Sequence, residues 1–290
     1  MDPQPTPPLL TRAERDVETW ARRFDPQSLP VLAETAAALE LWRLDEDAVD
    51  AHGVSDTLSQ DPLMMLKLFS LVASITRRRG SEDARSDPET VTAAMVMLGI
   101  GPFFRAFGPQ PLVGDTLQAT LGALDGFRAV LRRSTRAAAF AIGFAAHRMD
   151  PDAAVLHEAA LLHDFAELLL WLRAPTLALT ITHRQRADPA LRTAQAQRDV
   201  LNIELPDLQQ RLMRHWHLPA LLARSTDHRH ADDPQVRNVL LAIRVARHSA
   251  DGWDNPALPD DVTDIAALLQ LSPASTLRLL RDIDAADPSA

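Results

Sequence analysis

The sequence contains no cysteine among its 290 residues. Disulfide bridges and thiolate chemistry are therefore excluded, and the absence fits a reducing compartment. The chain also has no tyrosine and only 10 glycines. Runs dense in valine, isoleucine and threonine are few, and no segment shows the period-two alternation that is typical of a strand. These absences disfavour a β-rich fold, and the abundance of alanine and leucine predicts an all-α protein.

Long apolar runs and an excess of positive charge are missing as well. No uninterrupted apolar segment is long enough to cross a membrane. The N-terminal residues MDPQPTPPLL lack the basic region followed by an apolar region that marks a signal peptide. Basic residues number 30 against 39 acidic ones, for a net charge of -9. This balance argues against binding to nucleic acid polymers or membranes, so we expect a cytoplasmic protein.

Composition and helix signals divide the chain into three parts. Residues 1–28 read as a proline-rich N-terminal arm with a short helix. In that arm, Thr11 precedes a glutamate by three residues, a capping box that predicts a helix to about Phe24. Residues 29–250 read as one helical domain, and residues 251–290 as a C-terminal helical extension with a polar tail.

One helix is expected to lie at the centre of the domain. The segment 153–173 reads AAVLHEAALLHDFAELLLWLR and is apolar on most of its circumference, with one polar pair, His163-Asp164. An ionisable pair inside such a helix must be hydrogen-bonded, ion-paired or metal-bound, because an unpaired buried charge is costly. Earlier in the chain, Asp61-Pro62 is a strong start signal for another apolar helix.

Six short motifs follow one another along the chain. They are Leu29-Pro30, Asp61-Pro62-Leu63, Leu98-Gly99, Leu161-Leu162-His163-Asp164, Trp216-x-Leu218-Pro219 and Asp227-His228. In this order and at this spacing they resemble the HDOD family, the HD-related output domains. The resemblance covers about residues 29–250.

The resemblance implies an all-helical fold with an N-terminal helical half and a C-terminal half similar to HD-domain phosphohydrolases. Proteins of this family look like bacterial output or scaffold modules of signal transduction. They are often associated with cyclic-dinucleotide or two-component pathways. Catalytic activity is not generally established for them.

The metal site of the active HD hydrolases is incomplete in this sequence. Those enzymes need a first histidine, the His-Asp doublet and a distant aspartate, because one divalent ion takes three or more protein ligands and keeps a position open for water. The resemblance places Arg133 at the position of the first histidine and Arg247 at that of the distant aspartate. Two cations at ligand positions repel a metal ion. We therefore expect no metal, no cofactor and no catalytic residue.

The doublet allows two interpretations. In the first, His163 and Asp164 form a buried hydrogen-bonded pair that joins two helices, as the remnant of a former site. In the second, the pair faces Asp227 and His228, as the matching family motif implies. The four side chains would then line the pocket of a phosphohydrolase that acts on a nucleotide or cyclic dinucleotide.

A row of arginines also allows two interpretations. Arg128, Arg132 and Arg136 recur at a spacing of four, with Arg133 beside them, so they share one helix face. Guanidinium groups bind phosphate or carboxylate in a bidentate manner, and such a face could receive a cyclic dinucleotide or another small anion. The alternative is a solvated face that is paired with nearby acids.

The sequence thus predicts a non-catalytic bacterial signal-transduction output or scaffold module, which acts through contacts with a signalling protein. Two alternatives remain. One is a metal-dependent HD-type phosphohydrolase of a nucleotide or cyclic dinucleotide. The other is a binding module for a small anionic ligand.

Overall fold

The structure is a computed structural model of the chain, and it describes residues 8–46, 49–78, 88–225 and 232–286. The chain forms two compact units whose segments alternate along the sequence. The first unit contains the chain as far as Arg128 and then Phe165–Pro219, and the second contains Ala129–Asp164 and the chain from Ala220 onward. Each unit is therefore built from segments that are distant in sequence.

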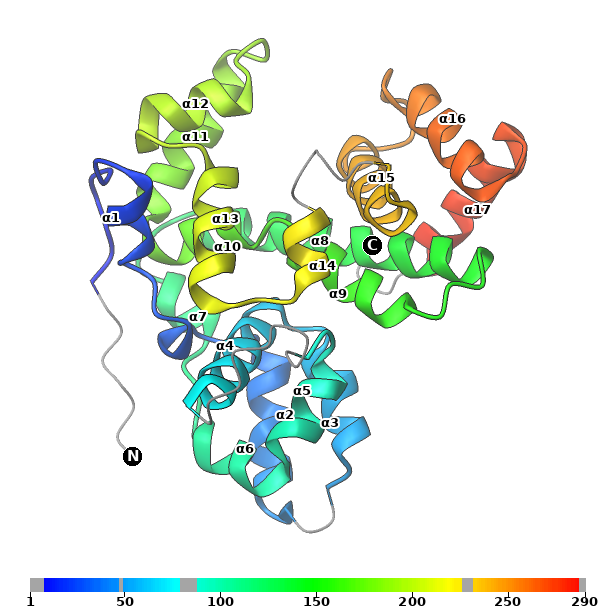
Figure 1. Ribbon diagram of the computed structural model, residues 1–290. Helices are drawn as coiled ribbons and strands as arrows, with labels where there is room; N and C mark the ends of the chain where they lie inside the picture. Colours follow the sequence, from blue (N-terminus) through cyan, green and yellow to red (C-terminus); the bar gives the residue numbers. More distant parts are fainter. Residues whose placement is uncertain (1–7, 47–48, 79–87, 226–231, 287–290) are drawn as a thin grey trace. The chain divides into compact units, whose positions relative to one another are not determined.

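The named elements of the first unit are α-helices and one stretch of 3-10 helix, η1 (Figure 1). They are α1 (Val17–Ala21), η1 (Pro26–Ser28), α2 (Ala33–Arg43), α3 (Ala51–Leu58), α4 (Pro62–Arg78), α5 (Val91–Leu98), α6 (Ile100–Ala106), α7 (Val113–Leu117), α10 (Phe165–Arg173), α11 (Pro175–Ala187), α12 (Thr193–Leu201) and α13 (Leu205–Trp216). The long helix α8 (Ala123–His147) begins in this unit and continues into the second.

The second unit contains the rest of α8. Its other helices are α9 (Ala153–Leu162), α14 (Ala220–Ser225), α15 (Pro234–His248), α16 (Leu258–Leu269) and α17 (Pro273–Ala286). Helix α15 packs against α9, α14 and α16, and α16 packs against α17. The helices α16 and α17 belong to the predicted C-terminal extension.

The predicted all-α fold class is confirmed. Throughout the described part of the chain the regular elements are helices, and the pairing of extended backbone is limited to an isolated parallel bridge between Val31 and Leu112. Within the same residues, no single helix is long and apolar enough to cross a membrane. The segments Ala153–Arg173 and Pro175–Ala187 are bent by 114° at the break between them. They meet the length and composition criteria for a membrane span only when they are taken together.

The predicted central helix is interrupted at its polar pair. Helix α9 ends at Leu162 and α10 begins at Phe165, so His163 and Asp164 lie in a turn, and the expectation of one continuous helix over 153–173 was wrong. The His163 amide donates to the carbonyl of Ala160 at 3.3 Å, three residues back, which tightens the end of α9 into a 3-10 turn. The boundary between the two units falls at this turn.

The N-terminal helix is shorter than predicted. Helix α1 begins at Val17, and Asp16 caps it by accepting a hydrogen bond from the Thr19 amide at 2.7 Å. The expected start at Thr11 and end near Phe24 were therefore wrong. Aspartate and threonine both cap helices well, so the residue type does not decide between them. Here Asp16, which directly precedes the helix, supplies the acceptor that was expected from Thr11.

The predicted start of α4 at Asp61-Pro62 is confirmed. The fully buried Asp61 carboxylate accepts from the amides of Leu63 and Met64 at 2.9 and 3.1 Å, and from the amide of Leu32 at 2.8 Å. It therefore caps α4 and fixes the entrance to α2 at the same time. Burial raises the pKa of Asp61, and the hydrogen bonds from these backbone groups oppose the rise.

One turn into the same helix lies Lys67, the only lysine in the sequence. Its side chain is buried, and Nζ donates to the carbonyl oxygens of Gln27 and Leu29, each at 2.7 Å. Lys67 thereby holds the loop between α1 and α2 against α4. Burial lowers the pKa of Lys67 to about 8, although the charges of Asp25 and Asp61 act in the opposite direction.

In the second unit, α17 packs closely on α8. The backbone at Gly143 lies so close to Ile283 that a Cβ atom there would collide with the isoleucine side chain. Nearby, Arg136 Nε donates to Asp284 Oδ1 at 2.8 Å.

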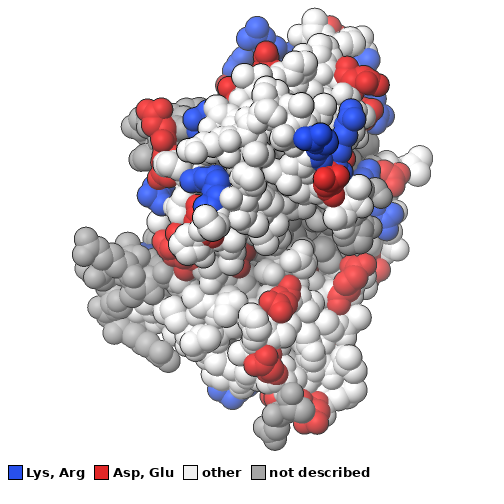
Figure 2. Space-filling model, turned by 90° about the vertical axis from the view of Figure 1, so that its right-hand side faces the viewer, with Lys and Arg blue, Asp and Glu red and all other residues white. Residues whose placement is uncertain are grey.

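On the face drawn in Figure 2, basic and acidic side chains lie interspersed in separate small patches.

Candidate functional site

His163 and Asp164 form the centre of a charged cluster inside the second unit. Asp164 Oδ2 accepts from Nε and Nη2 of Arg133 at 3.3 and 3.2 Å, and from Nη2 of Arg247 at 3.2 Å. Asp164 Oδ1 lies 3.0 Å from Nδ1 of His163. Because an ionised carboxylate can only accept, this geometry places a proton on Nδ1 of His163. Asp164 therefore joins the turn after α9 to α8 and α15.

The positive charges of the cluster balance the negative charge of the Asp164 carboxylate. Only 16% of the Asp164 side chain is exposed, whereas Arg247 is 52% exposed. Burial raises the pKa of Asp164. The hydrogen bond with His163 and the positive charges of His163, Arg247 and Arg133 outweigh burial, so the pKa lies well below its ordinary value. Asp164 thus remains ionised at neutral pH, with both oxygens occupied by donors from the protein itself.

The structure places only part of the predicted pocket. It brings His163 and Asp164 together with Arg133 and Arg247, the two arginines that the resemblance assigns to ligand positions. Asp227 and His228 lie outside the described residues. That they face the doublet stays a prediction.

The four arginines of the predicted anion-binding face occupy different environments on α8. Arg136 donates to Asp284, to the carbonyl of Ala246 at 3.1 Å and to Ser249 Oγ at 2.8 Å. Arg133 is engaged by Asp164. Arg128 and Arg132 are exposed. Two of the four guanidinium groups are therefore engaged by groups of the protein itself, and the binding of a small anion at this face stays a prediction.

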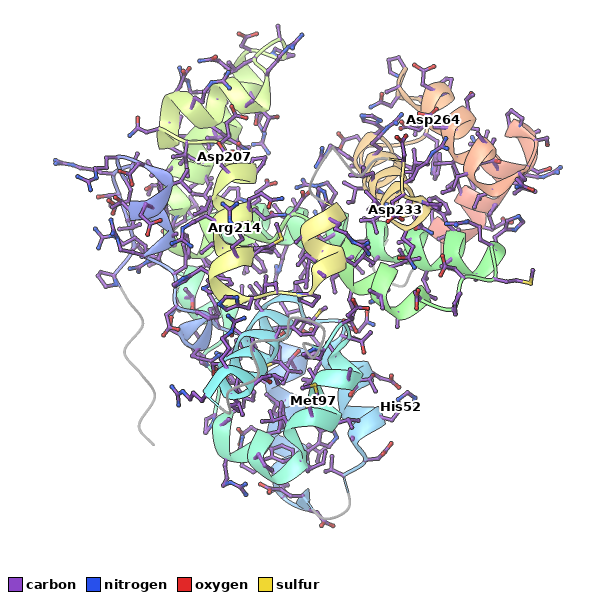
Figure 3. The ribbon with its side chains drawn as sticks, viewed as in Figure 1. His52, Met97, Asp207, Arg214, Asp233 and Asp264 are labelled. Carbon is purple, nitrogen blue, oxygen red and sulfur yellow. The ribbon has the colours of Figure 1, made fainter. Side chains whose placement is uncertain are left out.

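A second charged cluster of this unit was not predicted. The fully buried Asp261 accepts from Arg244 Nη2 at 2.6 Å and lies 2.6 Å from His248 Nδ1. Arg244 also donates to Asp264 at 2.9 Å, and Asp264 is labelled on α16 in Figure 3. The signal for it was a basic pair spaced i,i+4 on one amphipathic helix followed by an acidic pair spaced i,i+3 on the next. These contacts fasten α16 to α15.

The residues of the doublet do not fit a metal centre. One divalent ion needs three or more histidine, cysteine or carboxylate ligands. Among the described residues, no three such side chains are grouped closely enough to share an ion. At Asp164 the neighbours are two guanidinium groups, which have no lone pair to offer and carry the same sign of charge as a metal.

The comparison with known families agrees with the motif order. The HDOD domain matches residues 29–232, which is most of the chain. The chain belongs to the HDOD family. The family predicted from the sequence is therefore confirmed. Arg133 and Asp164 lie inside the matched range of this HDOD chain, whereas Arg247 and the helices α16 and α17 follow it.

Solved structures share the fold of this HDOD chain. The MmoQ response regulator of Methylococcus capsulatus is 18% identical with a TM-score of 0.60, covering 87% of this chain and 97% of its own. A virulence factor of Campylobacter jejuni is 17% identical with a TM-score of 0.62, covering 92% of this chain and 98% of its own. At these identities the similarity concerns the fold alone. A comparison with curated proteins gives no match.

Proposed function

We propose that this HDOD chain is a non-catalytic output or scaffold module of signal transduction, which acts in the cytoplasm by contacting another signalling protein. The state of Asp164 carries the proposal. The aspartate that would bind a metal in an HD hydrolase is neutralised here by Arg133 and Arg247. A carboxylate held in this way joins helices, and it is available neither as a metal ligand nor as a general base.

Two further observations support this role. MmoQ, which shares the fold, is described as a response regulator, a class of signalling protein. In addition, two leucines at the end of α2 are unusually accessible: Leu41 on the helix, at 67% exposure, and Leu44 just after it, at 84%. Leu41 borders a groove that is also lined by Trp42, Val49 and Val54. Exposed apolar side chains beside a groove are typical of surfaces that a partner protein covers.

Metal content tests the non-catalytic part of the proposal. The protein is expressed in medium supplemented with manganese and iron, purified without chelators, and analysed for its elements. The wild type is expected to hold less than about 0.1 equivalent of any transition metal. The double variant Arg133→His with Arg247→Asp is the matched control, because it restores the ligand types and is expected to retain more. About one equivalent in the wild type, lost in His163→Ala, would contradict the proposal.

Affinity capture tests the part that concerns protein contacts. The tagged wild type, the variant Leu41→Glu with Leu44→Glu, and Leu121→Glu are compared in lysate of the source organism by quantitative mass spectrometry. Leu121 is the control because it is 97% exposed but does not line this groove, and it precedes α8 in the chain. A partner is expected with the wild type and Leu121→Glu, and it should be lost with the double variant. If the wild type enriches no protein reproducibly, the proposal fails.

A further inference from the structure

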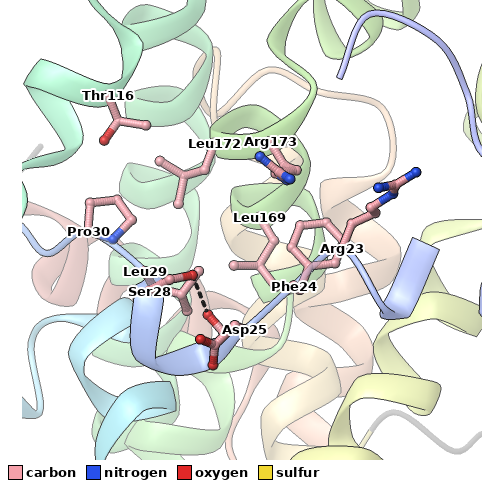
Figure 4. A pocket seen from close by; sticks show the side chains of 10 residues that line it. All are labelled: Arg23, Phe24, Asp25, Ser28, Leu29, Pro30, Thr116, Leu169, Leu172 and Arg173. Carbon is pink, nitrogen blue, oxygen red and sulfur yellow. Dashed lines mark hydrogen bonds between the residues drawn. The ribbon is translucent and has the colours of Figure 1, made fainter. Parts of the chain in front are cut away.

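A pocket of the first unit lies between the loop after α1 and the end of α10. The space between its lining residues, including the part that is open to solvent, has a volume of about 380 Å³. Its walls include the buried side chains of Phe24, Leu169 and Leu172. Figure 4 shows the guanidinium groups of Arg23 and Arg173 at the same end of the pocket.

One donor of Arg173, at this pocket, has no acceptor in the described part of the chain. Its Nη1 donates to the carbonyl of Pro8, but its Nε is buried and has no hydrogen-bond partner among the described residues. A buried donor that is left unsatisfied costs free energy, and native proteins rarely leave one without a reason. The Nε–Nη2 edge of a guanidinium is one that a carboxylate can bind in a bidentate manner.

Arg23 adds a second positive charge at the same end. It pairs with Glu14, whose Oε1 lies 2.6 Å from Arg23 Nε, and among the described residues no carboxylate pairs with Arg173. Burial lowers the pKa of Arg173, and the charge of Arg23 lowers it further. This end of the pocket therefore has an excess of positive charge, which favours the binding of an anion.

The rest of the lining restricts which anion fits. The carboxylate of Asp25 also lines the pocket and lies away from the two arginines (Figure 4). It would repel a second negative charge on the ligand, which disfavours nucleotides and other polyanions. The apolar walls between these charges favour a hydrocarbon body instead.

We propose that this pocket binds a small monocarboxylate with an apolar body. The carboxylate lies on the guanidinium of Arg173 and supplies the acceptor that Nε lacks. The apolar body lies against Phe24, Leu169 and Leu172. Because the walls come from both the loop after α1 and from α10, a bound ligand fastens the N-terminal arm to the domain. This binding site is independent of the proposed protein contacts.

A set of matched probes tests the chemistry of the ligand. Hexanoate, hexanamide and acetate are titrated into the full chain by isothermal calorimetry at pH 7. Hexanoate is expected to bind with a Kd on the order of 0.1–1 mM, as its few heavy atoms allow. Hexanamide has the same body without the charge, and acetate has the charge without the body, so both should bind at least tenfold more weakly. Equal binding of hexanoate and hexanamide would overturn the role of the arginines.

Variants locate the site. Arg173→Met and Arg23→Gln are expected to weaken hexanoate binding, the first by more than tenfold and the second by a few fold. Arg184→Met is the matched control, because Arg184 lies on α11, pairs with Asp199 and does not line the pocket. If Arg173→Met fails to fold, Arg173→Lys serves instead, since lysine keeps the charge but lacks the guanidinium edge. Unchanged binding in these pocket variants, or no binding of hexanoate to the wild type, would overturn the proposal.

Discussion

The Asp164 cluster of the second unit and the pocket of the first unit combine arginines and carboxylates in different arrangements. Each has two arginines, but the pocket has two carboxylates, Asp25 in its lining and Glu14 beside Arg23, whereas the other cluster has one, Asp164. At Asp164 the carboxylate lies between Arg133 and Arg247 and accepts from both. At the pocket, Arg23 pairs with Glu14, whereas Arg173 donates to a backbone carbonyl and pairs with no carboxylate among the described residues.

The difference shows that the pairing of one carboxylate with both arginines, rather than the number of charges, decides whether a cluster can bind a ligand. A carboxylate shared by two arginines satisfies both and leaves nothing for a metal or an anion. An arginine excluded from such sharing keeps a donor edge unused. The sequence motif pointed to the first cluster as the site of interest, whereas the unmet hydrogen bond points to the second.

The largest expected effect concerns Lys67, a cation of the first unit that does have its acceptors. In Lys67→Met the carbonyls of Gln27 and Leu29 lose their donor, and the loop that lines the pocket is released. We expect the free energy of unfolding to fall by about 3 kcal/mol, the cost of two buried carbonyls left unpaired. Urea denaturation measures it. Hexanoate binding should weaken as well, because Leu29 lines the pocket.

The pH dependence of stability checks the state of Lys67. Its pKa is lowered to about 8 in the folded protein, against an ordinary value of about 10.4. Between these values the unfolded chain binds more protons, so the stability of the wild type should rise with pH relative to Lys67→Met. Because the chain has one lysine, NMR of protein labelled with 13C-lysine gives one titrating signal. A midpoint above about 10 would contradict the lowered pKa.

The second prediction separates the two arginines of the Asp164 cluster from their carboxylate. Asp164→Asn removes the carboxylate that Arg133 and Arg247 share, and we expect a loss of about 2 kcal/mol in urea denaturation. Arg247→Gln is the milder control, with a loss below about 1 kcal/mol because Arg247 is half exposed. A loss in Asp164→Asn no larger than that in Arg247→Gln would show that Asp164 is not the shared centre.

Acid titration sharpens this test. The pKa of Asp164 is lowered in the folded state, so its contribution to stability is present above the unfolded value of about 3.9 and is lost as the pH falls through the lower folded value. The difference between wild type and Asp164→Asn should therefore be constant above about pH 5 and shrink below about pH 4. A difference that vanished near neutral pH would contradict the lowered pKa.

Much of the fold could be predicted from local sequence. The Asp61-Pro62 start, the absence of strands and the family motifs all depend on residues close together in the chain. The interruption at His163-Asp164 could not be predicted, because it accompanies contacts with Arg133 and Arg247, 31 and 83 residues away. An apolar helical pattern over 153–173 carries no signal for partners at such distances.

The charged clusters show the same limit. The resemblance indicated that Arg133 and Arg247 occupy ligand positions, but only the fold shows that they share one carboxylate. The pocket was not predicted at all, since Arg23 and Arg173 come from segments far apart and neither lies in a recognisable motif. Arg136 was grouped with the other arginines by its spacing, whereas tertiary contacts with Asp284 and Ser249 separate it from them.

The smallest expected effect tests whether an unmet hydrogen bond always indicates a ligand. Asn238 on α15 is fully buried, and in the described part of the chain neither atom of its amide has a partner. Unlike Arg173, it lines neither of the two pockets described above. We expect Asn238→Leu, which removes the unmet groups at similar volume, to stabilise the protein by about 1 kcal/mol in urea denaturation.

The outcome bears directly on the pocket. If Asn238→Leu stabilises the protein, an unpaired polar group away from the two pockets only lowers the stability of the fold. The unpaired Nε of Arg173 differs from it because it lies beside a pocket that a ligand can enter. If Asn238→Leu destabilises by more than about 1 kcal/mol, the asparagine has a partner such as a buried water. A buried water would then be the alternative acceptor for Arg173 Nε, and titrating hexanoate into wild type and Arg173→Met decides between the water and a carboxylate.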